Sequence, residues 1–148
     1  FLSHEDVDLS YRIQLLGHRC RYVPEALVRH VGSATIGRMS QKAVFYGQRN
    51  LEWLYLQNTP WPLLLRTLSG HLIYDVAAGV YLGLVGRGGA FLRGKWAALM
   101  GVGLAWRKRR VIQRSRRTSS QAIWEQLESH WISKKMREKR FDLGLFRH

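Results

Sequence analysis

The chain has 148 residues, 46% of them hydrophobic, so it is long enough for one modest domain and too apolar for wholesale disorder. Its net charge of +14 points to an anionic partner, and its single cysteine, Cys20, excludes an intrachain disulfide framework. No stretch reaches the roughly 18–20 uninterrupted apolar residues that a bilayer-spanning helix needs.

The positive charge is concentrated in the C-terminal part of the chain. Up to Asn58 there are seven Lys/Arg and five Asp/Glu, whereas from Thr59 onward there are 17 and five. Such an asymmetry is typical of an appendage that meets an anionic surface, either nucleic acid or acidic lipid headgroups. We therefore place a domain boundary after Asn58, between residues 1–58 and a basic, Trp-rich helical extension of residues 59–148.

The N-terminal unit predicts a helix, two short extended segments and a second helix. Leu9, Ile13 and Leu16 recur at helical spacing, and Gly17 closes the first helix. Residues 21–23 and 26–30 have the pattern of short strands, and residues 32–37 have the composition of a loop. A second helix over residues 40–57 ends where Pro60 prevents its continuation.

The extension predicts three or four further helices. The first covers residues 61–85, with a proline tolerated in its first turn, and a glycine-rich joint follows at residues 86–89. A long amphipathic helix covers residues 90–115, and Ser119 and Ser120 cap a last helix.

The chemistry-bearing residues of the chain lie near its beginning. Two adjacent carboxylates, Glu5 and Asp6, start the first helix, and a lone histidine, His30, ends the second extended segment. A sugar hydroxyl is a poor nucleophile, so a carboxylate base helps it to attack, and a nucleoside diphosphate leaving group needs a cation. Imidazole together with carboxylates suits Mn²⁺, whereas Mg²⁺ prefers oxygen ligands. The pattern therefore favours sugar transfer.

The same residues carry a resemblance to a known family. An acidic pair, an Asp-Leu-x-x-Arg turn, a Tyr-Val-Pro-Glu-Ala strand and a histidine follow in register over residues 5–13, 16–19, 22–26 and His30, continued by Tyr46, Gly47, Arg49 and Asn50. They resemble the C-terminal catalytic half of family-two glycosyltransferases, above all the bacterial branch that adds rhamnose or galactofuranose to cell-surface glycans. Because Phe1 is not an initiator methionine, we expect a fragment that is inactive alone.

The resemblance implies an α/β fold, in which residues 1–58 form the C-terminal half of a GT-A nucleotide-sugar domain and an amphipathic helical tail follows. It implies an inverting transfer of a sugar, rhamnose as a guess, from a nucleotide-sugar donor to a glycan or lipid-linked acceptor. Asp6 would be the general base, and His30 would bind the divalent metal, Mn²⁺ or Mg²⁺. The acceptor would contact His4, Glu5, Arg49 and Asn50.

Each of these residues also has a plainer interpretation. Glu5 and Asp6 could be the acidic charge that is common at helix N-termini. His30 could be an ordinary histidine at the end of a strand. Arg49 and Asn50 could form a polar network on a helix face. A metallohydrolase is a further alternative, but the chain lacks the His-Glu-x-x-His spacing.

The basic extension predicts a membrane partner. Its cationic run over residues 107–117 is flanked by Trp96 and Trp106, the pattern of a helix that lies in a membrane interface. We therefore expect a peripheral protein on an anionic membrane surface, the cytoplasmic face of a bacterial inner membrane by the resemblance. The alternative is a basic nucleic-acid- or membrane-binding helical module without catalysis. No nucleic acid is expected, because RNP, zinc-finger and homeodomain signatures are absent.

Overall fold

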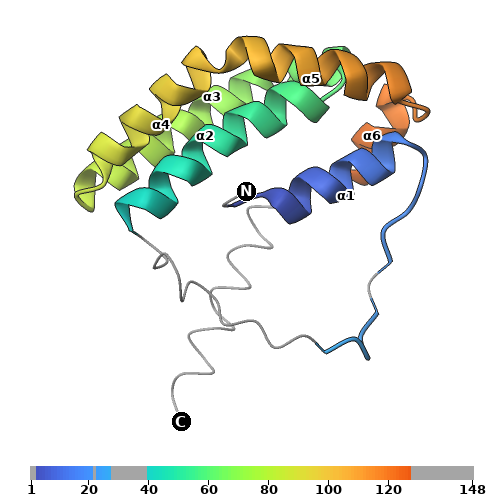
Figure 1. Cartoon of the computed structure of the whole chain (residues 1–148), viewed down its shortest axis with the longest axis horizontal. Helices are drawn as coiled ribbons and strands as arrows, with labels where there is room; N and C mark the ends of the chain where they lie inside the picture. Colours follow the sequence, from blue (N-terminus) through green and yellow to red (C-terminus); the bar gives the residue numbers. More distant parts are fainter. Residues whose placement is uncertain (1–2, 22, 28–39, 128–148) are drawn as a thin grey trace.

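The computed structural model describes residues 3–21, 23–27 and 40–127. Within these ranges the chain forms six α-helices and no strand: α1 (Glu5–Leu15), α2 (Gln41–Asn58), α3 (Trp61–Leu84), α4 (Gly88–Met100), α5 (Val102–Ser115) and α6 (Ser120–Gln126). In Figure 1, α2 runs through the middle of the view, with α4 and α5 along one side of it and α1 on the other.

The predicted α/β fold is wrong. In the described part of the expected strands, around Pro24, the backbone closes local turns, since the amide of Ala26 donates to the Val23 carbonyl and that of Leu27 to the Glu25 carbonyl. These segments are too short to be stable as strands without a partner, and the described chain offers them none. The helices pack on one another instead. The identification of residues 1–58 as half of a GT-A domain, which requires a sheet, is therefore corrected.

The predicted helices are largely confirmed, because their ends carry local signals. The Ser40 hydroxyl accepts a hydrogen bond of 3.1 Å from the amide of Ala43 and caps α2, and Ser119 caps α6 through the amide of Ala122 in the same way. Gly17 follows α1 with a positive φ of 88°. The predicted long helix over residues 90–115 is instead two helices, α4 and α5, which meet at Gly101.

The most extensive helix–helix contacts among the described residues are those of α2 with α4 and with α5. Three small residues spaced four apart on α4, Ala90, Gly94 and Ala98, are buried and allow a close approach. A Cβ added at Gly94 would lie 2.7 Å from the carbonyl oxygen of Phe45 on α2. At Gly101 an added Cβ would overlap the ring of Trp53, whose Nε1 donates to the Ala98 carbonyl at 3.0 Å. Backbone and ring therefore fit together without intervening side chains.

A buried arginine joins α5 to the end of α2. Arg109 is 6% exposed and donates to the carbonyl oxygens of Leu56 and Thr59 at 2.5 and 2.7 Å. These carbonyls belong to the last turn of α2 and its cap, where intrahelical partners are missing. The guanidinium also lies within 5.8 Å of the ring centroids of Trp61 and Trp106. Arg109 thereby fixes the corner at which α2 turns into α3.

The core between the helices is small. One cluster of buried side chains, Leu15, Leu63 and Ile123, joins α1, α3 and α6. The other, with Val44, Leu82 and Ala90, joins α2, α3 and α4. Many large apolar side chains of the described residues remain exposed, and most of them belong to α3, α4 and α5. The predicted domain boundary at Asn58 stays a prediction.

We predict that Gly94→Ala lowers the free energy of unfolding by about 2 kcal/mol, because the new Cβ forces α4 away from the α2 backbone. Gly70→Ala is the matched control: Gly70 lies in α3 with no heavy atom within 4 Å of the added Cβ, so this change should raise stability by about 0.5–1 kcal/mol. Urea unfolding followed by circular dichroism measures both. Equal effects of the two substitutions would contradict the close approach of α2 and α4.

Candidate functional site

A cleft of about 490 Å³ lies between α1, α2 and α5. Its walls come from parts of the chain that are far apart in sequence, and the lining residues are Ser3, His4, Asp8, Arg12, Arg49, Asn50, Trp53, Leu54, Gln57, Lys108, Val111 and Ile112. The cleft lies where α1, α2 and α5 meet, since each of these helices contacts the other two. Its volume lies in the range of small-molecule sites.

The cations of the cleft come from three different helices. Arg12 belongs to α1, Arg49 to α2 and Lys108 to α5, whereas Asp8 is the one acidic side chain among the lining residues. Asp8 forms an ion pair with Arg12 on its own helix and also accepts from the Asn58 amide at 2.7 Å. Among the described residues that line the cleft there are therefore three cations and one carboxylate.

The guanidinium of Arg49 is held in a fixed position. It donates to the side-chain oxygen of Asn50 at 3.1 and 3.0 Å, and its central carbon lies 4.8 and 4.6 Å from the ring centroids of Tyr46 and Trp53. The Asn50 side-chain nitrogen in turn donates to the carbonyl of Ser3 at 3.2 Å. These contacts hold the guanidinium of Arg49 in place and join Ser3 to α2.

The backbone is strained where α1 begins, at the edge of the cleft. Ser3 and His4 have φ angles of 97° and 67°, a left-handed region that side-chain-bearing residues rarely adopt. His4 is the residue that precedes α1, and its side chain caps no helix amide. The hydrogen bond from Asn50 holds this turn against the cleft wall.

The cleft brings together three of the predicted acceptor-binding residues, His4, Arg49 and Asn50. Glu5 and Asp6 lie on the exposed first turn of α1 and are not among the lining residues, and Asp6 accepts from the amide of Val7 at 2.8 Å. The predicted metal ligand, His30, lies outside the described residues. The roles of all these residues in sugar transfer, and the convergence of Asp6 with His30, stay predictions.

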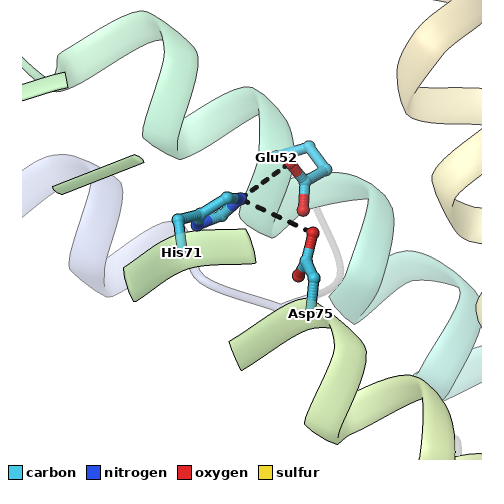
Figure 2. A group of neighbouring side chains, drawn as sticks. All are labelled: Glu52, His71 and Asp75. Atoms are coloured by element: carbon cyan, nitrogen blue, oxygen red, sulfur yellow. Dashed lines mark hydrogen bonds and ion pairs between the residues drawn. The ribbon is translucent and has the colours of Figure 1, made fainter. Parts of the chain in front are cut away.

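A second cluster of polar side chains ties α3 and α4 to α2. Figure 2 shows its members from α2 and α3, Glu52, His71 and Asp75. His71 Nε2 lies 2.9 Å from an oxygen of Glu52 and 3.7 Å from one of Asp75. The ammonium of Lys95 lies 2.6 Å from Asp75 and forms an ion pair with Glu52 as well. The ring of His71 stacks on that of Tyr55 at a centroid distance of 4.0 Å. Each charged side chain of this cluster is at least three-quarters buried.

The cluster could supply three metal ligands, because single ligand atoms of Glu52, His71 and Asp75 lie within 4.8 Å of one another. The ammonium of Lys95, however, already forms ion pairs with both carboxylates, Glu52 and Asp75. It supplies the positive charge that a metal ion would otherwise bring. The arrangement therefore fits an internal ion-pair network better than a metal centre. A divalent cofactor stays a prediction.

The pKa of Glu52 is lower than its ordinary value of 4.5. Burial alone would raise this pKa, but the hydrogen bonds from His71 and Lys95 and the charge of Lys95 outweigh the effect of burial. Glu52 is therefore ionised at neutral pH and holds its two partners from α2.

Sequence reasoning missed this cluster. Glu52, His71 and Lys95 were not among the candidate site residues that the sequence predicted. A signal was present, because His71 and Asp75 lie four residues apart in a helix that is otherwise almost uncharged, which places them on one face. Which residue of another helix would meet that face could not be derived from helical spacing.

A third feature is the exposed apolar surface of α3 and α4. We name it the outer face and define it by the exposed large apolar residues of α3 and α4: Trp61, Leu65, Leu68, Leu72, Ile73, Tyr74, Val76, Val80, Tyr81, Leu84, Leu92, Trp96, Leu99 and Met100. Ile73, Val76 and Trp96 are 70%, 69% and 65% exposed. Among the described residues, no helix combines the length and apolarity needed to cross a membrane.

Comparisons of the chain with protein-family models, with curated proteins and with solved structures gave no match. Together with the all-helical structure of the described residues, this result overturns the resemblance to family-two glycosyltransferases.

We predict that Glu52→Gln makes the protein less stable at pH 7 and less sensitive to acid. A group whose folded pKa is depressed stabilises the protein above its unfolded pKa, here about 4.5, and this stabilisation is lost as the pH falls through the folded pKa. Urea unfolding at pH 7 and at pH values below 4.5 measures the difference between wild type and variant. The difference should shrink as the pH falls, and a constant difference would contradict the assigned role of Glu52.

Proposed function

We propose that the chain is a helical module that binds an anionic membrane surface, with α3 and α4 lying in the plane of the interface. The observation that carries this proposal is the outer face. Ten of the 24 residues of α3 are large apolar residues exposed to solvent. An apolar surface of this extent is uncommon on a monomeric protein in water and indicates a partner that removes it from water.

The charge of the same region selects the kind of partner. Between Thr59 and Leu127 the chain has eleven Lys/Arg and two Asp/Glu, and one of these acids, Asp75, is neutralised by Lys95. Exposed arginines occur on three helices of the region, with Arg66 on α3, Arg93 on α4 and Arg110 on α5. Each cation close to an anionic leaflet contributes roughly 1 kcal/mol to binding.

Three tryptophans support an interfacial position. Trp61, Trp96 and Trp106 are 52%, 65% and 40% exposed, and Trp61 packs edge-on against Trp106 at 6.5 Å. Tryptophan is enriched at the headgroup level of membranes, because its ring is apolar and its N–H is a hydrogen-bond donor. Exposed apolar residues, arginines and tryptophans therefore occur together on neighbouring helices, and each of these residue types favours contact with a membrane interface.

A nucleic-acid partner would explain the exposed arginines but not the exposed apolar residues. Phosphates would pair with the arginines of α5, but they would leave the outer face exposed, because a backbone of phosphates and sugars offers no large apolar surface. A membrane accounts for the arginines and for the apolar residues together. The proposal concerns binding and assigns no reaction to the chain.

We predict that Ile73→Asp weakens binding to anionic vesicles at least about tenfold, because it replaces an apolar side chain that enters the interface by a charge that repels the lipids. Flotation of the whole chain with vesicles of phosphatidylcholine containing phosphatidylglycerol measures the bound fraction. Vesicles of phosphatidylcholine alone should bind less. Raised salt should weaken binding without abolishing it, because the apolar contribution is not screened.

Leu9→Asp is the matched control, since Leu9 is 58% exposed on α1 and lies outside the outer face. It introduces the same charge and should leave flotation unchanged. Equal losses in both variants would contradict the proposal. So would a dimer in sedimentation velocity that Ile73→Asp dissociates, with no vesicle binding by the wild type, because a second copy would then cover the face. A DNA gel shift without flotation would favour the nucleic-acid alternative.

A further inference from the structure

We infer that three exposed arginines of α5 form a headgroup site for a lipid that carries two phosphate groups. We name these residues, Arg107, Arg110 and Arg114, the arginine stripe. The inference rests on the proposed membrane binding, because it names the lipid that the membrane-bound chain would hold at this helix. Lys108 lines the cleft between α1, α2 and α5 and is not part of the stripe.

The arginine stripe lies on the side of α5 that is turned away from the bundle. Ala105 and Arg109 are the buried residues of this helix. An α-helix turns by about 100° per residue, so Arg107 lies about 160° around the helix axis from each of them. Arg110 and Arg114 lie within about 60° of Arg107 on the same side, and the three positions span about 10 Å along the axis. All three side chains are therefore accessible to one ligand.

The arginine stripe costs stability in the bare protein. Residues three and four positions apart are neighbours on a helix surface, so Arg107 repels Arg110, and Arg110 repels Arg114. The sequence of α5 contains no Asp or Glu that could form a helical ion pair with them. Among the described residues, no ion pair includes a member of the stripe. A ligand with more than one negative charge would replace this repulsion by attraction.

The chemistry of arginine points to phosphate as the charged group. A guanidinium is planar and binds two oxygens of one phosphate at once. A lipid with a single phosphodiester carries one negative charge, so it neutralises one arginine and leaves the other two repelling each other. Two phosphates joined through one glycerol neutralise two arginines, and the second contact forms within a complex that already exists. The stripe therefore favours a lipid with two phosphates over two separate lipids.

Apolar side chains beside the arginine stripe favour a lipid over a soluble anion. Leu104 and Trp106 are 43% and 40% exposed, and helical spacing places them on opposite flanks of the stripe. Trp106 packs edge-on against Trp61, which belongs to the outer face. In Figure 1, α5 also continues directly from α4 at Gly101. The stripe therefore adjoins the surface for which we propose contact with the membrane, where headgroups and acyl chains are both within reach.

Flotation of the whole chain with two kinds of vesicle tests the inference. Both contain phosphatidylcholine. One adds phosphatidylglycerol, which has one phosphate, and the other adds diphosphatidylglycerol, which has two, at half the molar fraction, so that both surfaces carry the same charge. The wild type should bind the second kind at least about fivefold more tightly. Equal binding to both would overturn the inference and leave the proposed membrane binding intact.

A double variant, Arg107→Gln with Arg114→Gln, tests whether the stripe causes the preference. It leaves one arginine in the stripe and should lower the preference to less than about twofold. The matched control, Arg66→Gln with Arg93→Gln, removes the same charge from exposed positions of α3 and α4. It should weaken binding to both kinds of vesicle alike and keep the preference. Unchanged circular dichroism spectra establish that the variants fold.

The remaining outcomes separate this inference from the proposed function. Equal losses of preference in the two double variants would overturn the inference. So would tighter binding of single-stranded DNA than of diphosphatidylglycerol vesicles, because a nucleic acid would then occupy the stripe. Ile73→Asp should weaken binding to both kinds of vesicle and keep their ratio. If Ile73→Asp instead bound like the wild type while the stripe variant lost its preference, the outer face would be refuted and the stripe supported.

Discussion

The close contact of α2 with α4 is the constraint on which the rest of the structure depends. Gly94 lets the α4 backbone approach the Phe45 carbonyl, and Gly101 leaves room for the ring of Trp53. This contact brings Lys95 to Glu52 and so anchors α3 through His71 and Asp75. The same contact fixes Trp53 as a wall of the cleft. One small-residue crossing thus positions both the buried ion-pair network and the cleft.

Close packing through glycine and alanine has a cost, because it buries little apolar area. Three of the nine apolar residues in the described core are alanines, whereas leucines, valines and tryptophans of α3 and α4 face outward. The polar network at Glu52 compensates in part by holding α3 from its inner side. The protein therefore presents two different surfaces on different helices: an apolar outer face bordered by arginines, and a cleft lined by charged and apolar side chains.

Local signals in the sequence were sufficient for most helices and insufficient for the segments between them. Ser40, Pro60 and Ser119 act on the backbone of their own neighbours, so the ends of α2 and the start of α6 could be predicted without knowledge of the fold. The strands predicted around Pro24 required partner strands, which the pattern of neighbouring residues does not specify. The family resemblance implied an α/β fold with such strands, and it was wrong as well. The break at Gly101 was not predicted, although glycine disfavours a helix interior. That Gly101 packs against the ring of Trp53, 48 positions earlier, could not be derived from α4 and α5 alone.

The sequence by itself determined the positions of most helices and a strongly basic chain with its positive charge in the second part, because composition and helical periodicity are properties of neighbouring residues. It did not determine the fold class, because the predicted α/β fold is wrong. It also led to the prediction that His4, Glu5, Arg49 and Asn50 bind an acceptor, a role that stays a prediction. Only the tertiary structure decided that His4, Arg49 and Asn50 line one cleft with Lys108, and that Glu52 meets His71 and Lys95. It alone decided which apolar residues stay outside the core. Such contacts join residues tens of positions apart, and they are fixed by how helices cross.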